Sequence, residues 1–232
     1  MTNATSTERA ALARRVHGVY LLTPDVDAAD FSAMLRRLNV ALEAGVALVQ
    51  YRNKTATTSE RSRQAALVQA AAREHGALFI VNDDVDLAVQ LGADGVHLGR
   101  DDGDIAAAQA RLPGALLGVS CYNDLVRAQR AAESGADILA FGSVFPSTTK
   151  PAAVRASLSL LQRARAEFGA QRIVAIGGID AGNIESVGAA GAHAAALISA
   201  VFDAPDPRAA VRILQREFNQ GMLQHEPQRT AV

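Results

Sequence analysis

The sequence alternates eight times between a short apolar run and a longer segment whose apolar residues recur at helical spacing. We predict strands at residues 18–22, 47–51, 78–81, 95–98, 116–120, 138–141, 173–176 and 194–198. We predict helices at residues 27–43, 59–75, 85–91, 104–111, 123–134, 156–168, 183–190 and 207–218. Eight such units without a break favour an α/β fold, a closed (βα)8 TIM barrel with its helices outside.

The alternative is an open, doubly wound sheet. Against it, the first strand is followed by Leu22-Thr23-Pro24-Asp25 and not by a glycine-rich dinucleotide turn. A chain of 232 residues that is 49% hydrophobic can bury one large core, and no linker divides it. We therefore expect one catalytic domain at residues 16–220, after a lead-in at 1–15 that is disordered or a short helix, and before a polar tail at 221–232.

Charge and cysteine usage exclude several classes of protein. A formal net charge of −1 gives no general attraction to nucleic acid or anionic membrane, and no apolar run has the length of a membrane span. Cys121 is the single cysteine and cannot form an internal disulfide, which is typical of a reducing compartment. We expect a cytoplasmic protein that acts on small molecules, and the sequence leaves open whether it forms a homo-oligomer.

In such a barrel the chemistry lies on the loops that follow the strands. After the second predicted strand, the alternation of side chains places Gln50, Arg52 and Lys54 on one side. A guanidinium and an ammonium group on one face suit a polyphosphate. The alternative is a solvated basic edge without a ligand.

Acidic residues follow the next two strands. Asn82 and Asp83 come after the third, and Asp101 and Asp102 come after the fourth. Because parallel strands end at the same edge, Asp83 and Asp102 can share one Mg2+ ion, with diphosphate oxygens and water completing its coordination. Two alternatives stay open: each aspartate caps the following helix, or the nearby cations pair with these acids.

The later loops suggest a second anion site. The connection at residues 142–151 carries hydroxyl groups and ends near Lys150, Gly177-Gly178 follows the seventh strand, and Ile198-Ser199 follows the eighth. Glycine lets backbone amides approach a phosphate closely, although a tight turn also needs glycine. A diphosphate site and a monophosphate site on one barrel mouth are what an enzyme needs to join an activated group to a phosphorylated acceptor.

Other polar residues carry weaker signals. We expect Asn123 to cap a helix and Cys121 to be a small buried residue, because no histidine is placed to activate it. The histidines show no metal-ligand spacing, and we expect them to be structural.

Several segments together resemble the thiamine-phosphate synthase family over roughly residues 16–207. They are QYRNK at 50–54, VNDDVDLAVQLGADGVHLGRDD at 81–102, GVS at 118–120, GSVFPSTTK at 142–150, AIGGI at 175–179 and LIS at 197–199. The resemblance implies a pyrimidine diphosphate site made by Gln50, Arg52, Lys54, Asn82, Ser120 and Lys150, of which Arg52, Lys54, Ser120 and Lys150 would be catalytic. It implies magnesium ligands at Asp83 and Asp102, and a thiazole phosphate site made by Ser147, Thr149, Gly178, Ile198 and Ser199.

The implied reaction is loss of diphosphate from the pyrimidine methylene group and capture of the resulting cation by the thiazole nitrogen, with decarboxylation when the thiazole is carboxylated. The chain departs from the family pattern at Arg100, Cys121-Tyr122, Ser143, Ser147 and Ala153. Ser147 keeps the hydroxyl of the usual threonine, and none of these changes removes a predicted metal or diphosphate ligand. Two other functions remain: a thiazole tautomerase-like enzyme on the same barrel, and a non-catalytic phosphate-binding barrel.

Overall fold

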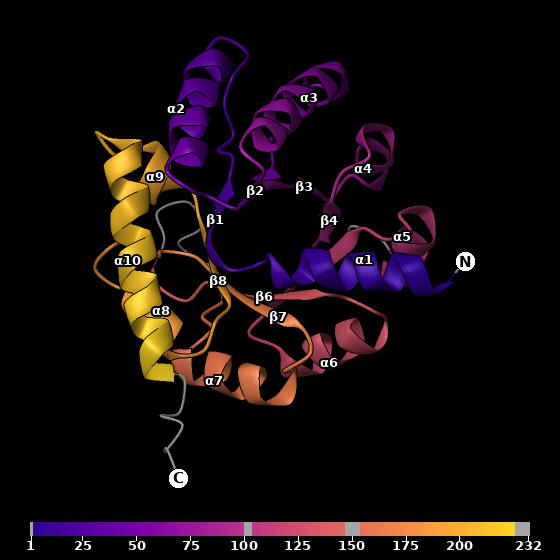
Figure 1. Ribbon diagram of the computed structural model, residues 1–232, viewed down its shortest axis with the longest axis vertical. Helices are drawn as coiled ribbons and strands as arrows, with labels where there is room; N and C mark the ends of the chain where they lie inside the picture. Colours follow the sequence, from indigo (N-terminus) through magenta and orange to yellow (C-terminus); the bar gives the residue numbers. More distant parts are fainter. Residues whose placement is uncertain (1, 100–103, 147–153, 226–232) are drawn as a thin grey trace.

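The computed structural model describes residues 2–99, 104–146 and 154–225. In this part of the chain eight parallel strands close into a barrel in sequence order (Figure 1). The strands are β1 (Gly18–Leu22), β2 (Leu48–Tyr51), β3 (Leu78–Asn82), β4 (Gly95–Leu98), β5 (Leu116–Tyr122), β6 (Ile138–Gly142), β7 (Arg172–Ile176) and β8 (Ala194–Leu197). The predicted TIM barrel is confirmed, because β1 pairs with both β2 and β8 and leaves no open edge.

Helices surround the barrel, and each of the eight predicted ones is present (Figure 1). They are α2 (Phe31–Glu43), α3 (Thr58–Glu74), α4 (Val85–Leu91), α5 (Ile105–Arg111), α6 (Leu125–Glu133), α7 (Leu158–Glu167), α8 (Ile184–Ala189) and α10 (Pro207–His225). Two more helices are α1 (Thr2–Arg14) and the short α9 (Ser199–Phe202). No helix of the described residues is long and apolar enough to cross a membrane.

The strands are buried on both faces, as parallel strands between two layers must be. Tyr20, Leu48 and Leu78 point into the barrel and belong to its inner apolar cluster. Their neighbours Val49 and Phe79 belong to the outer cluster, which the strands share with the helices. This double burial explains why the strands appear in the sequence as continuous apolar runs.

The amino-terminal helix covers the end of the barrel where the strands begin (Figure 1). Leu12 and Ala13 at the end of α1 pack against the inner apolar cluster. The Arg9 guanidinium donates to both carboxylate oxygens of Asp137, at 2.9 and 2.8 Å. This end is therefore closed, and the opposite end is left for a site.

Three aspartates begin helices at the opposite end. Asp84, Asp104 and Asp124 each accept a hydrogen bond from the backbone amide three residues on, at the starts of α4, α5 and α6. The prediction that Asn123 caps its helix is wrong, because Asp124 is the cap. Capping of α4 by Asp83 is excluded in the same way, because Asp84 is the cap.

Candidate active site

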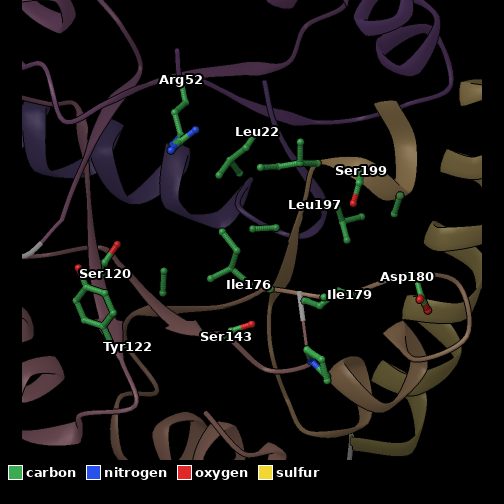
Figure 2. A pocket seen from close by; sticks show the side chains of 18 residues that line it. Leu22, Arg52, Ser120, Tyr122, Ser143, Ile176, Ile179, Asp180, Leu197 and Ser199 are labelled. Carbon is green, nitrogen blue, oxygen red and sulfur yellow. The ribbon is translucent and has the colours of Figure 1, made fainter. Parts of the chain in front are cut away.

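A cavity of about 510 Å³ opens among the carboxyl ends of the strands. Its walls come from the ends of β1, β5, β6, β7 and β8 and from the segments that follow β2, β6, β7 and β8. Five predicted site residues line it: Arg52, Ser120, Gly178, Ile198 and Ser199. In Figure 2, Ser120 lies on one side of the view and Ser199 on the other, with Arg52 above them. The cavity therefore brings part of each predicted sub-site into one space.

Two ion pairs lie beside this cavity. Arg52 Nη1 is 2.7 Å from Asp25 Oδ2, and Lys54 Nζ is 3.2 Å from Asp83 Oδ2. Asp25 also accepts the backbone amide of Lys54 at 2.7 Å. The alternative that a nearby cation pairs with the acids after the third and fourth strands holds for Lys54 and Asp83. Arg52 pairs instead with Asp25, which was not predicted. The Asp25 carboxylate holds the Arg52 side chain near the end of β2, and the Asp83 carboxylate holds the Lys54 side chain there.

The predicted alternation along residues 50–54 is confirmed by contacts. Gln50 Nε2 donates to the Tyr20 hydroxyl oxygen at 2.7 Å inside the barrel. Tyr51 and Asn53 both donate to Gln64 Oε1 on α3, at 3.0 Å each, on the outer side. Burial raises the pKa of Tyr20 far above its usual range, so its hydroxyl stays protonated. Gln50 is thus held in the barrel floor and is not among the residues that line the cavity.

Asp83 lies at the end of β3 in an unusual backbone conformation, with φ +63°. Its amide donates to the carbonyl oxygen of His97 on β4 at 2.8 Å, which fixes the residue between two strand ends. Its side chain is 25% exposed. A partly exposed carboxylate suits a hard cation that takes its remaining ligands from phosphate and water. Within the described residues no three metal-binding side chains gather, so any ion there needs a substrate or residues outside that range.

Ser120 on β5 is oriented by a residue from β4. His97 Nε2 lies 3.0 Å from Ser120 Oγ. The imidazole ring lies over Gly118, where an added Cβ would come 2.4 Å from its Nδ1 atom. Glycine at position 118 therefore leaves the space in which the ring reaches Ser120.

The far side of the cavity is formed by the turn after β7 and the start of α9. Gly178 has φ +63°, and a Cβ there would lie 2.2 Å from the Pro146 carbonyl oxygen. Asn183 holds this turn by donating from Nδ2 to the Gly178 carbonyl oxygen at 2.9 Å. Ser199 is the first residue of α9, and it lines the same space together with Ile198 and Ala200. Backbone groups in such a turn suit a phosphate.

Cys121 and the remaining predicted residues do not line the cavity within the described part of the chain. Burial raises the pKa of the Cys121 thiol to about 12, so it stays protonated, as expected for a buried structural residue. Asn82 ends β3, and neither it nor Lys54 nor Asp83 is among the residues that line the cavity. Asp102, Ser147, Thr149 and Lys150 lie outside the described residues, as do Asp101, Arg100 and Ala153.

The sequence predictions missed two residues of this site. Asp25, which pairs with Arg52, follows β1 in the segment that was used only to exclude a dinucleotide turn. The signal that could have identified Asp25 is its position shortly after the end of a strand. Tyr122 lines the cavity next to Ser120, but its place there depends on an irregularity in β5 that leaves no mark in the sequence.

Comparisons with known proteins agree with this geometry. The model of the thiamine monophosphate synthase family matches residues 19–201. A curated thiamine-phosphate synthase from Chromobacterium violaceum is 52% identical over 205 residues, which cover 88% of this chain and 97% of that protein. One from Halorhodospira halophila is 50% identical over 205 residues, covering 87% and 94%. The solved thiamine phosphate pyrophosphorylase from Pyrococcus furiosus is 34% identical, with a TM-score of 0.80 over 91% of this chain and 99% of that one.

Proposed function

The chain belongs to the thiamine monophosphate synthase family, and from this premise we propose which of its residues carry out the synthesis of thiamine phosphate. In that reaction a pyrimidine group leaves diphosphate and is transferred to the nitrogen of thiazole phosphate. One observation carries the assignment. A single cavity is lined by Arg52 and Ser120 on one side and by Gly178 and Ser199 on the other.

The basic side of the cavity takes the pyrimidine diphosphate. Arg52 binds diphosphate oxygens in pairs and Lys54 adds a second positive charge. The Ser120 hydroxyl at the end of β5, oriented by His97, forms a hydrogen bond with the same substrate. Gln50, Asn82 and Lys150 are assigned to the same substrate from the sequence. The ion pairs with Asp25 and Asp83 support the proposal, because they keep both cations at the barrel mouth.

Asp83 and Asp102 are the proposed ligands of Mg2+. The Asp83 carboxylate fits this role because it is partly exposed, is not used as a helix cap, and lies beside Lys54. When bound, the ion supplies positive charge that stabilises the departing diphosphate. Lys54, whose ammonium group lies 3.2 Å from the Asp83 carboxylate, would share this task.

The glycine and hydroxyl side takes the thiazole phosphate. The backbone at Gly178, Ile198 and Ser199 supplies amide groups, and the Ser199 hydroxyl adds a further donor. Ser147 and Thr149 are assigned to this side from the sequence. The positive φ of Gly178 and the close Pro146 carbonyl oxygen support the proposal, since a Cβ at position 178 would clash with Pro146, which lines the same cavity.

The reaction needs no protein nucleophile. The bond between the pyrimidine methylene carbon and the bridging oxygen breaks, and its electron pair leaves with diphosphate. The thiazole nitrogen then donates its lone pair to the methylene cation, and a carboxylated thiazole also loses CO2. Arg52, Lys54 and Lys150 stabilise the charge that develops on the leaving group. The protonated Cys121 thiol has no part in these steps.

The test is an assay of thiamine phosphate after the purified chain is mixed with pyrimidine diphosphate, thiazole phosphate and Mg2+. We expect product only when all three are present. Calorimetry with inorganic diphosphate, with and without Mg2+, serves as a second measurement. If diphosphate binds equally well with and without Mg2+ and no thiamine phosphate is formed, a non-catalytic phosphate-binding barrel would be the better description. Tautomerisation of thiazole without use of the pyrimidine would favour the tautomerase.

We also propose that the enzyme works in the cytoplasm. Its single cysteine is buried within the barrel wall, so the fold does not depend on an oxidising compartment. Self-association stays a prediction of the sequence, to be measured by light scattering.

A further inference from the structure

Tyr122 has a backbone conformation that a tyrosine rarely adopts. Its φ is +57°, in the left-handed region that mainly glycine, asparagine and aspartate occupy. For a bulky residue this conformation carries a conformational cost, so surrounding contacts must hold it. Residues held in this way often have a role in a site.

The conformation coincides with an irregularity in the sheet. The pairing of β5 with β6 shifts between Ser120 and Tyr122, so that Ser120 pairs with Ala140 and Tyr122 with Phe141. A bulge of this kind turns the next side chain away from its regular direction. Cys121 is left buried in the wall, while both Ser120 and Tyr122 line the cavity. Figure 2 shows the Tyr122 ring directly beside Ser120.

One arginine from α6 holds this segment from outside. The Arg127 guanidinium carbon lies 5.8 Å from the centre of the Tyr122 ring. Arg127 also donates to the Ser120 carbonyl oxygen at 2.7 Å and to the Gly99 carbonyl oxygen at 2.9 Å. The same side chain therefore fixes the ends of β4 and β5 and supports the ring.

We propose that the Tyr122 ring packs against the pyrimidine ring of the diphosphate substrate and so contributes to its selection. The inference rests on the proposed function and adds a residue to it. Tyr122 lies beside Ser120 at the side assigned to the pyrimidine diphosphate, across the view from Ser199 (Figure 2). A flat heteroaromatic ring is the ligand chemistry that an aromatic wall recognises. Arg127 acts as a positioning residue, because its contacts are with the ring and the strand ends.

The test compares Tyr122→Asn with Tyr122→Phe. Asparagine tolerates the left-handed conformation but has no ring, whereas phenylalanine keeps the ring. We expect Tyr122→Asn to raise the KM for pyrimidine diphosphate about tenfold, with the KM for thiazole phosphate changed by less than about twofold. Tyr122→Phe should restore most of the lost affinity. The melting temperature of Tyr122→Asn should not fall, which separates loss of the ring from loss of the fold.

Val126→Asn is the matched control, because Val126 is 62% exposed on α6 and is not among the residues that line the cavity. It should leave both KM values unchanged. An unchanged KM for pyrimidine diphosphate in Tyr122→Asn would overturn the inference, and so would an equal rise in both KM values or a failure of Tyr122→Phe to restore affinity. If the unmodified chain makes no thiamine phosphate, the proposed function fails. The role of Tyr122 is then still tested by the calorimetric Kd of pyrimidine diphosphate for the unmodified chain, Tyr122→Asn and Tyr122→Phe. A Kd that is raised in Tyr122→Asn alone would support the packing of the two rings.

Discussion

Asp83 and Asp84 are adjacent, yet their carboxylates have different partners. Asp84 accepts the backbone amide of Leu87 at 2.9 Å and begins α4. Asp83 has a left-handed backbone and faces Lys54 at 3.2 Å. The backbone turn at Asp83 separates the two side chains, so one serves the helix and the other serves the barrel mouth.

The two aspartates should therefore respond differently to substitution. Asp83→Asn keeps a residue that tolerates positive φ but removes the charge. We expect kcat/KM to fall about tenfold or more and the Mg2+ concentration for half-maximal rate to rise, with an unchanged melting temperature. Asp84→Ala should cost about 1 kcal/mol of stability and leave the Mg2+ dependence unchanged. Enzyme kinetics over a magnesium series and thermal melts measure both effects. If both variants changed the Mg2+ dependence and the stability in the same way, the separate roles of Asp83 and Asp84 would be contradicted.

His193 illustrates a histidine whose role is structural. Its Nδ1 atom accepts the backbone amide of Ile173 at 2.9 Å, and its Nε2 atom faces the Arg165 guanidinium. Burial, with Arg165, Arg172 and His225 nearby, lowers the pKa of His193 from 6.5 to about 3. The folded protein thus holds this ring neutral across the mildly acidic range.

The lowered pKa predicts acid sensitivity. Below pH 6.5 the unfolded chain takes up a proton at His193, whereas the folded chain does so only near pH 3. The free energy of unfolding should therefore fall as the pH is lowered from 6.5 toward 3. His193→Asn keeps an acceptor for the Ile173 amide but cannot titrate. Urea titrations at a series of pH values should show that the free energy of unfolding falls less steeply with decreasing pH in this variant than in the unmodified chain. The same dependence on pH in both proteins would contradict the lowered pKa of His193.

At the scale of elements, glycines set how closely two segments approach. Gly178 lets the β7–α8 turn lie against the Pro146 carbonyl. Gly221 does the same between α10 and α8, where an added Cβ would come 2.0 Å from the Glu185 carbonyl oxygen. The first contact shapes the cavity, and the second holds two outer helices together. Gly221 lies in the part of α10 that continues past its predicted end at residue 218, to His225.

Alanine at each glycine should separate function from stability. Gly178→Ala adds both a strained φ and a clash at the phosphate cradle, and we expect the KM for thiazole phosphate to rise about tenfold. Gly221→Ala should lower stability by about 1–3 kcal/mol, because the helices must move apart, without a change in either KM. Steady-state kinetics and denaturant unfolding test the pair. A normal KM in Gly178→Ala would argue against a phosphate at that turn.

At the scale of the whole molecule, the two ends of the barrel have different tasks. The end where strands begin is closed by α1 and by the pair of Arg9 with Asp137, whose side chains are 14% and 17% exposed. Burial raises the pKa of Asp137 despite this partner and the hydrogen bond from the Leu117 amide. The other end holds the cavity and the charged residues of the proposed site.

Removal of the Arg9 side chain should affect only the closed end. Arg9→Ala leaves a largely buried carboxylate with fewer partners, and we expect a loss of about 1–3 kcal/mol of stability. Both KM values should stay the same, since the cavity lies at the far end of the strands. Chemical denaturation and steady-state kinetics on one preparation check this expectation. A raised KM with full stability would show that the two ends are coupled.

The barrel and most of its strand-end residues can be predicted from the sequence. Apolar periodicity is a local property, and eight strand and helix patterns in strict order leave few folds that bury every apolar face. Parallel strands also end at one edge, so the order of the elements predicts that Arg52, Gly178 and Ser199 lie at one barrel mouth. These inferences need only the order of the elements. Ser120 is assigned to the site by the resemblance to thiamine-phosphate synthases.

The partner of each polar group depends on the folded structure. Arg52 pairs with Asp25, 27 residues earlier, and Ser120 meets His97, 23 residues earlier. Asp84 and Asp124 cap helices where Asp83 and Asn123 were equally plausible caps, and the bulge in β5 brings Tyr122 to the cavity. Such choices depend on distances between side chains that are remote in the chain and on differences of about 1 kcal/mol, which a local pattern does not encode.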